Sequence, residues 1–321
     1  MIRLARRAGV TLVELLVVVA VIGTMIGLLL PAVQAARESG RASACQSHLR
    51  QVALAVALHG DATGAIPPAR NDGVVGSDFA APVGGPTWLW TILPFIEDGT
   101  GFQWPAGEKF GDVPETVQKH IVGLYLCPSR RSPATALTEA SAGPARAAPC
   151  GCILPGLTVQ AGAISDYAGN QGDLSSGPAE FYRGGRGTGT IIGSRIEPES
   201  MRPVDRVRWR DISDGLPATL LVGKAHARQA HVSQLPDVGP AYDGSQFQFC
   251  SRVGGPGVGI AAGPLDDGAG TGWMAFGSWH PAGCQVAFAD GRVGRLSANL
   301  APDLLAALCN RSDGSARSAT E

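Results

Sequence analysis

A histidine and an aspartate near the end of the chain have the residue types of an acid–base pair. His280 and Asp290 are separated by nine residues, and Gly291 follows the aspartate. A general base and the carboxylate that orients it must lie within hydrogen-bond reach. The run C-Q-V-A-F between them predicts a strand and D-G predicts a hairpin turn, which puts the pair roughly 20 Å apart at ~3.3 Å per residue. We therefore expect Asp290 to be a turn residue and His280 to pack at the start of the strand.

Seven cysteines bring thiol chemistry to the chain. C-G-C at Cys150 and Cys152 lies in a Pro/Ala/Gly-rich stretch without a C-x-x-C pair or a His pair at zinc spacing. We therefore expect a loop staple there and no metal site. Cys45 lies on a predicted apolar helix stripe, and Cys127 lies in L-C-P-S, a segment expected to pack on it. We predict a disulfide between Cys45 and Cys127.

The sequence lacks the short motifs of common catalytic sites. It contains no G-x-S-x-G, H-E-x-x-H or phosphate-binding loop, so we expect no enzyme activity and no cofactor. The formal net charge is −1. Removing residues 1–9 takes away three arginines and leaves 23 basic against 27 acidic residues, a net charge of −4. This excludes the basic footprint of a nucleic-acid-binding protein.

One carboxylate interrupts an apolar run at the N-terminus. Residues 9–30 read G-V-T-L-V-E-L-L-V-V-V-A-V-I-G-T-M-I-G-L-L-L, with Glu14 as the only charged residue. About 20 apolar residues at ~1.5 Å per residue cross a hydrocarbon core of ~30 Å. An acid there costs about 2.5–3.5 kcal/mol on insertion scales, so a functional role is expected. Arg3, Arg6 and Arg7 precede the run and predict a cytoplasmic N-terminal end.

The elements that position these residues begin with one long helix, predicted over 10–59, whose residues 10–30 span the membrane. Beyond Pro31, which is expected to kink the helix, Gly60 supplies the predicted C-cap. The apolar stripe of the second half consists of Cys45, Leu49, Val52, Val56 and His59.

The body, predicted over 60–310, is rich in turns and is followed by a flexible tail over 311–321. Residues 87–98 predict a strand or a short buried helix, 165–173 a turn, and 187–194 a short strand. The run 218–224 predicts a strand, 284–296 a hairpin, and 302–310 a short helix. We therefore predict an α+β fold in which the long helix packs on a mainly antiparallel sheet with long loops.

The N-terminal pattern resembles the start of type IV prepilins and pseudopilins. A short basic leader, Gly9, an apolar residue and T-L-V-E occur in the family's register, although most members carry Phe at the position of Val10. The resemblance implies a pilin-like fold, cleavage after Gly9 by a prepilin peptidase and N-methylation of Val10. It also implies that Glu14 pairs with the amine of a neighbouring subunit's Val10, because each charge is costly alone in lipid.

Two other interpretations of the N-terminus stay open. An ordinary secretory signal peptide would be cut after Ala35, although the apolar region of such a signal runs about 7–15 residues and carries no acid. In an unprocessed membrane anchor, Glu14 would have no role. The prepilin interpretation is favoured because the leader, Gly9, Thr11 and Glu14 all fall in register.

The body is similar to a large bacterial family of pseudopilin-like proteins. His280, Asp290 and Gly291 form its H-x₉-D-G pattern, and the family's C-terminal domain has no assigned function, although one label groups it with solute-binding domains. The sequence differs from the pattern at Lys224, where Glu is expected, and at Trp279. Further similar segments are P-A-V-Q-A-A-R-E, C-Q-S-H-L-R-Q-V, I-P-P-A, W-T-I-L-P-F-I-E, L-C-P-S, D-Y-A-G-N, D-I-S-D-G and F-A-D-G-R-V.

The resemblance implies a structural subunit of the bacterial inner membrane, with a single span and an extracytoplasmic C-terminal domain. Its expected partners are a prepilin peptidase, the membrane and other pseudopilin subunits in a type II secretion or type IV pilus-like filament. An alternative is an anchored binding module that uses the prepilin segment only for export. Its candidate contact residues are Trp88, Trp90, Trp104 and Trp273. An anchored enzyme is the third alternative.

Overall fold

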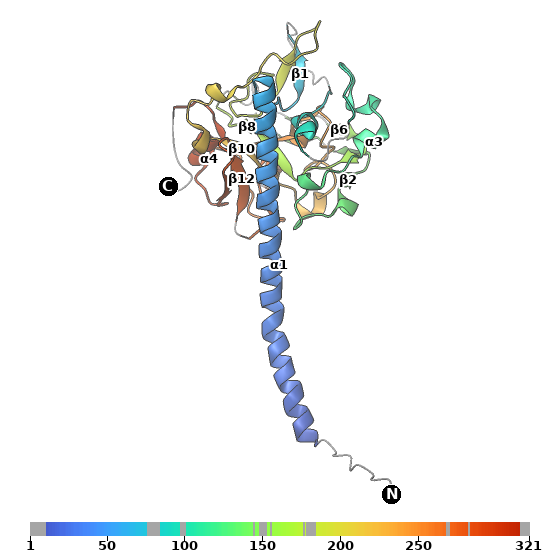
Figure 1. Ribbon diagram of the computed structural model, residues 1–321, viewed down its shortest axis with the longest axis vertical. Coiled ribbons are helices and arrows are strands. Elements are labelled where there is room, and N and C mark those ends of the chain that lie inside the picture. Colours follow the sequence, from blue (N-terminus) through green and yellow to red (C-terminus); the bar gives the residue numbers. More distant parts are fainter. Residues whose placement is uncertain are drawn as a thin grey trace.

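The computed structural model describes residues 11–75, 84–96, 101–143, 145–147, 153–154, 156–175, 177, 184–267, 270–281 and 283–314. One long helix, α1 (Leu12–Thr63), projects from a mixed head, and its C-terminal half packs along one side of that head (Figure 1). The fold is α+β with a mainly antiparallel central sheet, which confirms the predicted fold class.

Both ends of α1 carry capping interactions. At the start, the Thr11 side chain accepts a hydrogen bond from the Glu14 backbone, and the Glu14 side chain accepts one from the Thr11 backbone. At the end, Gly64 adopts a left-handed conformation with φ 75° and its N–H donates to the Gly60 carbonyl. The predicted end at His59 with a Gly60 cap was therefore wrong, because the residue that adopts the left-handed cap conformation is Gly64.

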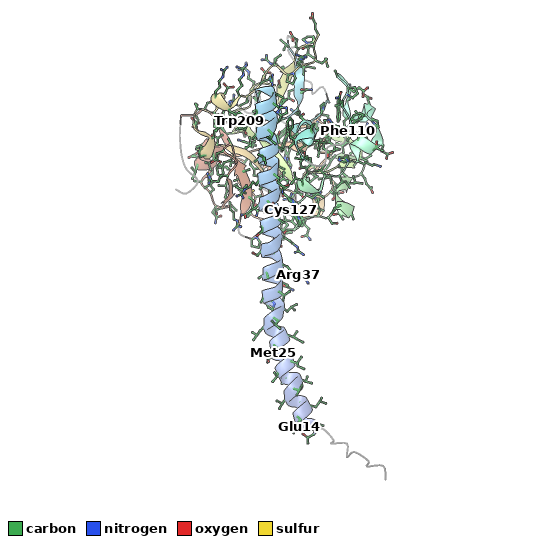
Figure 2. All side chains as sticks on the ribbon, viewed as in Figure 1. Glu14, Met25, Arg37, Phe110, Cys127 and Trp209 are labelled. Carbon is green, nitrogen blue, oxygen red and sulfur yellow. The ribbon has the colours of Figure 1, made fainter. Side chains whose placement is uncertain are left out.

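The helix is uninterrupted across Pro31, which lies inside it. N-terminal to residue 38 its side chains are exposed, whereas the C-terminal part buries one stripe against the head (Figure 2). The predicted stripe is confirmed, since all five of its members are buried. The buried residues of α1 are Cys45, Leu49, Val52, Ala53, Ala55, Val56, His59 and Gly60.

The head is built on a five-stranded sheet with the order β11-β8-β10-β12-β13. β11 pairs with β8 in parallel, and the other three pairings are antiparallel. The predicted strand over 218–224 and the predicted hairpin are both confirmed. The strands are β8 (Tyr167–Gly172), β10 (Leu220–Lys224), β11 (Ser251–Val253), β12 (Cys284–Phe288) and β13 (Val293–Leu296).

Side chains alternate between the two faces of β12, and both faces are covered. Val286 and Phe288 belong to a cluster with residues of α4 (Pro302–Cys309), which confirms the predicted C-terminal helix. Ala287 belongs to the cluster that contains the α1 stripe, and the Gln285 amide donates to the Ala42 carbonyl of α1. The sheet thus lies between α1 and the α4 side of the head.

Two predictions for the middle of the chain were wrong. The stretch 165–173 was predicted as a turn, but it contains β8, where the Asn170 side chain donates to the carbonyls of Leu220 and Cys309. The stretch 187–194 was predicted as a strand, but only Ser194 is in one, β9 (Ser194–Ile196). Tertiary contacts override local turn chemistry in the first case, because the Asn170 side chain fixes the strand against its neighbours.

The remaining elements are short. Residues 87–98, predicted as strand or short helix, contain α2 (Trp88–Thr91) and the 3-10 helix η1 (Leu93–Phe95). The other strands are β1 (Asn71–Val74), β2 (Leu137–Thr138), β3 (Ser141–Gly143), β4 (Arg146–Ala147), β5 (Ile153–Leu154), β6 (Leu157–Val159) and β7 (Gly162–Ala163). The helix α3 (Glu115–Gln118) completes the set of α-helices in the described part of the chain. The other 3-10 helices are η2 (Phe110–Asp112), η3 (Gly123–Tyr125), η4 (Pro133–Thr135), η5 (Trp209–Asp211), η6 (Leu216–Ala218), η7 (Gln229–His231), η8 (Phe247–Phe249) and η10 (Gly272–Met274).

Candidate functional site

The projecting half of α1 is the first candidate site. It is long and apolar enough to cross a membrane by length and composition, as a membrane anchor or a signal sequence would be. Glu14 and Met25 lie on this bare part of the helix (Figure 2). The Glu14 carboxylate accepts hydrogen bonds from the Thr11 backbone and hydroxyl, both at 2.8 Å. The predicted processing residues Gly9 and Val10 lie outside the described part of the chain.

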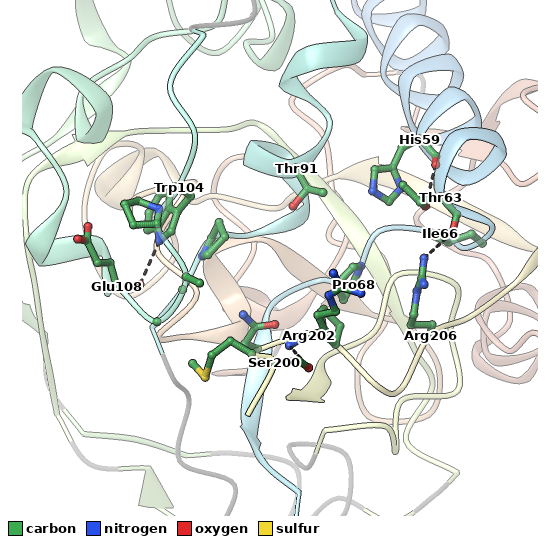
Figure 3. A pocket seen from close by; sticks show the side chains of 18 residues that line it. His59, Thr63, Ile66, Pro68, Thr91, Trp104, Glu108, Ser200, Arg202 and Arg206 are labelled. Atoms are coloured by element: carbon green, nitrogen blue, oxygen red, sulfur yellow. Dashed lines mark hydrogen bonds between the residues drawn. The ribbon is translucent and has the colours of Figure 1, made fainter. Parts of the chain in front are cut away.

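A pocket beside the C-terminal end of α1 is the second candidate (Figure 3). It has a volume of about 600 Å³. Its walls include Thr63 and Trp104, and its rim carries Arg206, whose guanidinium donates to the Thr63 carbonyl at 2.8 Å. A second pocket of about 470 Å³ is lined by Trp90 and Trp104. Trp104 therefore borders both cavities.

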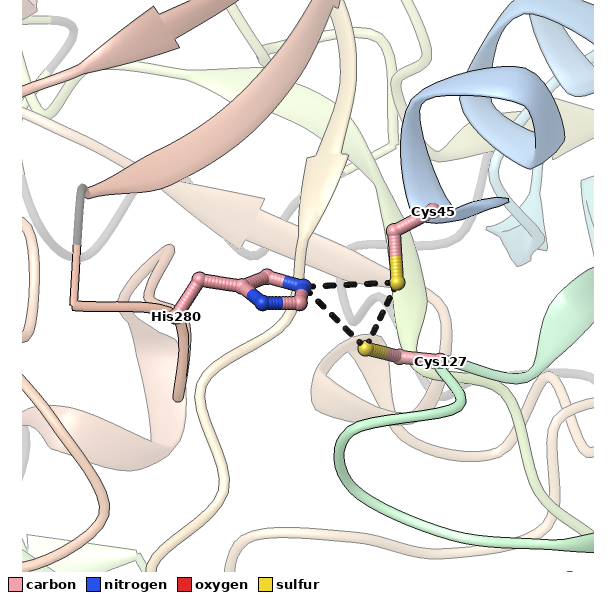
Figure 4. A group of neighbouring side chains, drawn as sticks. All are labelled: Cys45, Cys127 and His280. Atoms are coloured by element: carbon pink, nitrogen blue, oxygen red, sulfur yellow. Dashed lines mark hydrogen bonds between the residues drawn. The ribbon is translucent and has the colours of Figure 1, made fainter. Parts of the chain in front are cut away.

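The third candidate is a cluster of two thiols and an imidazole inside the head (Figure 4). The sulfurs of Cys45 and Cys127 lie 2.8 Å apart. The Nε2 atom of His280 lies 3.3 Å from the Cys45 sulfur and 3.6 Å from the Cys127 sulfur. All three residues are buried. The structure thus brings together three predicted residues, two from the proposed disulfide and one from the H-x₉-D-G pattern.

Three separate elements position this cluster. Cys45 lies on the buried stripe of α1, and His280 lies just before β12. Cys127 follows the 3-10 turn η3, and its backbone N–H donates to the Asp166 carboxylate at 2.7 Å. Asp166 also forms ion pairs with Arg130 and Arg131, both at 2.9 Å. A buried carboxylate therefore fixes the loop that carries one of the two sulfurs.

A lysine from the sheet completes the inner part of the cluster. Lys224 ends β10 and is fully buried. Its Nζ lies 2.7 Å from the Cys127 sulfur and 3.9 Å from the Cys45 sulfur. A buried cation needs a counter-charge. A thiolate at Cys127 supplies that charge to the Lys224 ammonium.

The outer side of His280 faces a carboxylate. Its Nδ1 lies 2.5 Å from a Glu38 oxygen, and the Ser129 hydroxyl donates to the same carboxylate at 2.9 Å. The Glu38 side chain is 30% exposed, whereas His280 is 2% exposed. With Nδ1–H donating to Glu38, the Nε2 of a neutral ring presents a lone pair to the two sulfurs.

The two thiols of the cluster differ in acidity. The hydrogen bond from Cys45 is the main cause that lowers the pKa of Cys127, with His280 and Lys224 acting in the same direction against burial. That same hydrogen bond, together with burial, raises the pKa of Cys45. In the reduced cluster, these opposite shifts favour a thiolate at Cys127 and a thiol at Cys45.

The rest of the H-x₉-D-G pattern lies apart from His280. Asp290 and Gly291 form the turn between β12 and β13, and Gly291 has φ 83°. The Asp290 carboxylate accepts a hydrogen bond from the Arg292 backbone at 2.9 Å. His280 and Asp290 lie at the two ends of β12 and have different partners, and the pair forms no acid–base unit.

Comparison with known proteins gives one match. Residues 34–303 match the sequence model of a family described as "Protein of unknown function (DUF1559)". The chain belongs to this family. The match covers the second half of α1 and most of the head, including all members of the thiol–imidazole cluster. No curated protein and no solved structure matches the chain.

Membership in DUF1559 confirms the prediction that the chain belongs to a family of unknown function. Glu38, Lys224 and Asp166 were not predicted as site residues from the sequence. Lys224 had a visible signal, since a lysine ends the apolar run L-L-V-G and stands where a glutamate was expected. Glu38 had none, because it lies among other charged residues on a predicted solvent-facing part of the helix.

Proposed function

We propose that the chain is a pseudopilin-like structural subunit of a bacterial inner membrane. Prepilin peptidase cleaves it after Gly9, residues 10–30 remain in the membrane, and the head lies outside the cytoplasm. Neighbouring subunits pack through their apolar helices into a filament of the type II secretion or type IV pilus kind. The role is structural and not catalytic.

The observation that carries this proposal is the division of α1 into two halves. Its C-terminal half buries a stripe in the head, whereas large apolar side chains between Leu12 and Val33 are exposed. Burying such side chains is worth about 1.5–3 kcal/mol each, so this surface requires lipid or other helices around it. Both environments are available to a subunit in a membrane and then in a helical bundle.

Glu14 supports the assembly part of the proposal. It is the only acid in the apolar run, and it lies at the N-terminal end of α1, four residues after Val10, whose amine cleavage would free. A carboxylate at that depth is tolerated best when a cation neutralises it. The amine of Val10 on an adjacent subunit is a cation of the right kind, and the pair sets the stagger between subunits.

Mass spectrometry of the N-terminal peptide tests processing directly. Protein isolated from its own cell is expected to begin at N-methylated Val10. A chain that begins at Met1 would show an unprocessed anchor, and one that begins at Ala36 would show ordinary secretion; each contradicts the proposal.

A binding module is the second candidate function, because Trp104 borders both pockets of the head. Aromatic side chains at the edge of a cavity suit sugar or peptide ligands. The other predicted tryptophans contribute less, since Trp88 and Trp273 are buried in core clusters. Calorimetric titration with oligosaccharide and peptide panels, comparing the wild type with Trp104→Ala, tests this function.

A further inference from the structure

We propose that Cys45, Cys127 and His280 bind one thiolate-preferring metal ion of the zinc class. Their ligand atoms all lie within 4.8 Å of one another, and the three residues come from α1, the η3 loop and the segment before β12. Two sulfurs and one imidazole nitrogen form a set that selects soft or borderline ions over magnesium or calcium.

The orientation of His280 is the second and independent observation. A metal-binding histidine almost always donates its other ring N–H to a carboxylate or carbonyl, which fixes the ring and makes it a better ligand. Glu38 occupies that place, 2.5 Å from Nδ1, and the Ser129 hydroxyl donates to the same carboxylate oxygen at 2.9 Å. A disulfide between Cys45 and Cys127 would need neither the histidine nor the glutamate.

The distances fit a tetrahedral ion after a small movement of the sulfurs. Zinc bonds of about 2.3 Å to sulfur and about 2.0 Å to nitrogen put neighbouring ligand atoms roughly 3.5–3.8 Å apart. The two nitrogen–sulfur distances, 3.3 and 3.6 Å, are close to this value. The sulfurs of Cys45 and Cys127, at 2.8 Å, would have to separate by about 1 Å. Rotation about the Cα–Cβ bonds provides a movement of this size.

The charges of the site also favour an ion. A divalent metal, two thiolates, the Lys224 ammonium and the Glu38 carboxylate together carry no net charge when the imidazole is neutral. The Lys224 ammonium then donates to a metal-bound sulfur, as it does to Cys127 at 2.7 Å here.

Cobalt titration of the reduced full-length protein in detergent tests the proposal. Protein is freed of metal with a chelator, kept under reducing and anaerobic conditions, and titrated with Co²⁺. We expect one thiolate-to-cobalt charge-transfer absorption per chain, saturating at one ion and displaced by Zn²⁺. Cys45→Ser, Cys127→Ser and His280→Gln should each weaken binding at least 10-fold.

Matched variants separate metal binding from loss of folding. Cys250→Ser changes a buried cysteine whose thiol donates to the Ala69 carbonyl, and it should leave the absorption unchanged. Glu38→Gln lies at a partly exposed position and should weaken binding about 10- to 100-fold while the helix content is kept. Its effect reports the orientation of His280 and not the presence of a ligand atom.

Three results would overturn the proposal. The first is the absence of a charge-transfer absorption in the reduced wild type. The second is an absorption that survives both Cys45→Ser and Cys127→Ser. The third is protein isolated from its own cell with the two cysteines joined as a disulfide and without bound zinc. Isolated protein that contains one zinc ion per chain would support the proposal, provided that its two cysteines react with an alkylating agent only after a chelator has removed the zinc.

Discussion

The Nδ1 atom of His280 lies 2.5 Å from a carboxylate oxygen of Glu38, although 242 positions separate the two residues in the sequence. The contact joins the long helix to the segment that opens the C-terminal hairpin. It lies where α1 first contacts the head, N-terminal to Cys45, which is the first buried residue of the stripe. The junction between helix and head is therefore polar at its edge and apolar along the rest of the stripe.

Replacing Glu38 should loosen this junction. The carboxylate accepts hydrogen bonds from Ser129 and contacts His280, so Glu38→Ala is expected to lower the free energy of unfolding by about 1–3 kcal/mol. Chemical denaturation of the full chain in detergent measures the change. The exposed neighbour Arg37 provides the control, because Arg37→Ala should stay within about 0.5 kcal/mol. Equal losses in both variants would mean that the junction has no special role.

Replacing Asp166 should lower the free energy of unfolding far more than replacing an exposed acidic residue. It is buried and pairs with Arg130 and Arg131, so Asp166→Asn leaves two guanidinium groups without their counter-charge. A loss of about 3–5 kcal/mol in unfolding free energy is expected. Glu115 pairs with Lys119 on the surface, and Glu115→Gln should cost less than about 1 kcal/mol. Thermal unfolding of both variants distinguishes a buried pair from an exposed one.

Two glycines of α1 should respond in opposite ways to the same substitution. A Cβ atom at Gly60 would lie 2.7 Å from the Trp209 indole nitrogen, whereas one at Gly40 meets nothing within 4 Å. Gly40→Ala is therefore expected to stabilise the helix by about 0.5–1 kcal/mol. Gly60→Ala should destabilise by about 1–2 kcal/mol because the indole must move. A stabilising Gly60→Ala would show that the Trp209 contact is loose.

His226 should make the head acid-sensitive. Burial lowers the pKa of His226 to about 4, below the ordinary 6.5, and its Nε2 donates to the Asp266 carbonyl. The unfolded chain takes up this proton as the pH falls through 6.5, and the folded chain takes it up only near 4. Stability from this group is complete above 6.5 and is lost between 6.5 and 4, by at most about 3 kcal/mol.

Denaturation curves at several pH values check this sign. His226→Gln keeps a donor for the carbonyl and removes the titration, so its stability should fall less between pH 6.5 and 4 than that of the wild type. The same acid loss in both proteins would assign the effect to other groups.

Glu14 has two roles to distinguish, because it closes a capping box with Thr11. Glutamine preserves a capping box at this position, whereas alanine does not. If the carboxylate pairs between subunits, Glu14→Gln and Glu14→Ala should both leave insertion and cleavage intact but abolish filaments. If the residue only caps the helix, Glu14→Gln should assemble normally. Electron microscopy of sheared filaments measures the outcome.

The sequence predicted the elements whose pattern is set by burial on one face. The stripe from Cys45 to His59 and the hairpin after His280 are of this kind, and both are in the structure. β8 was missed because its Gly and Asn residues are typical of turns. Gly169 of β8 allows close packing, since a Cβ atom there would lie 2.7 Å from the Ile191 side chain. This contact involves a residue that is distant in the sequence, so the local pattern around Gly169 does not predict it.

The candidate site was predicted in part. Cys45 and Cys127 were placed together from the stripe and the L-C-P-S segment, and their sulfurs are in contact. The arrival of His280 and Lys224 at the same point depends on how β10 and β12 pair beneath α1, which no local pattern encodes. The predicted staple at Cys150 and Cys152 lies outside the described part of the chain.

The uninterrupted course of α1 through Pro31 has a mechanical consequence. Between Leu30 and Cys45 the helix rises about 20 Å at ~1.5 Å per residue, so in the proposed membrane subunit this stretch sets the height of the head above the lipid. All residues of this stretch are helical, so its two ends cannot move apart without breaking helix hydrogen bonds. In the proposed subunit, a pull along α1 therefore acts on the head at the junction that Glu38 and Cys45 form with it.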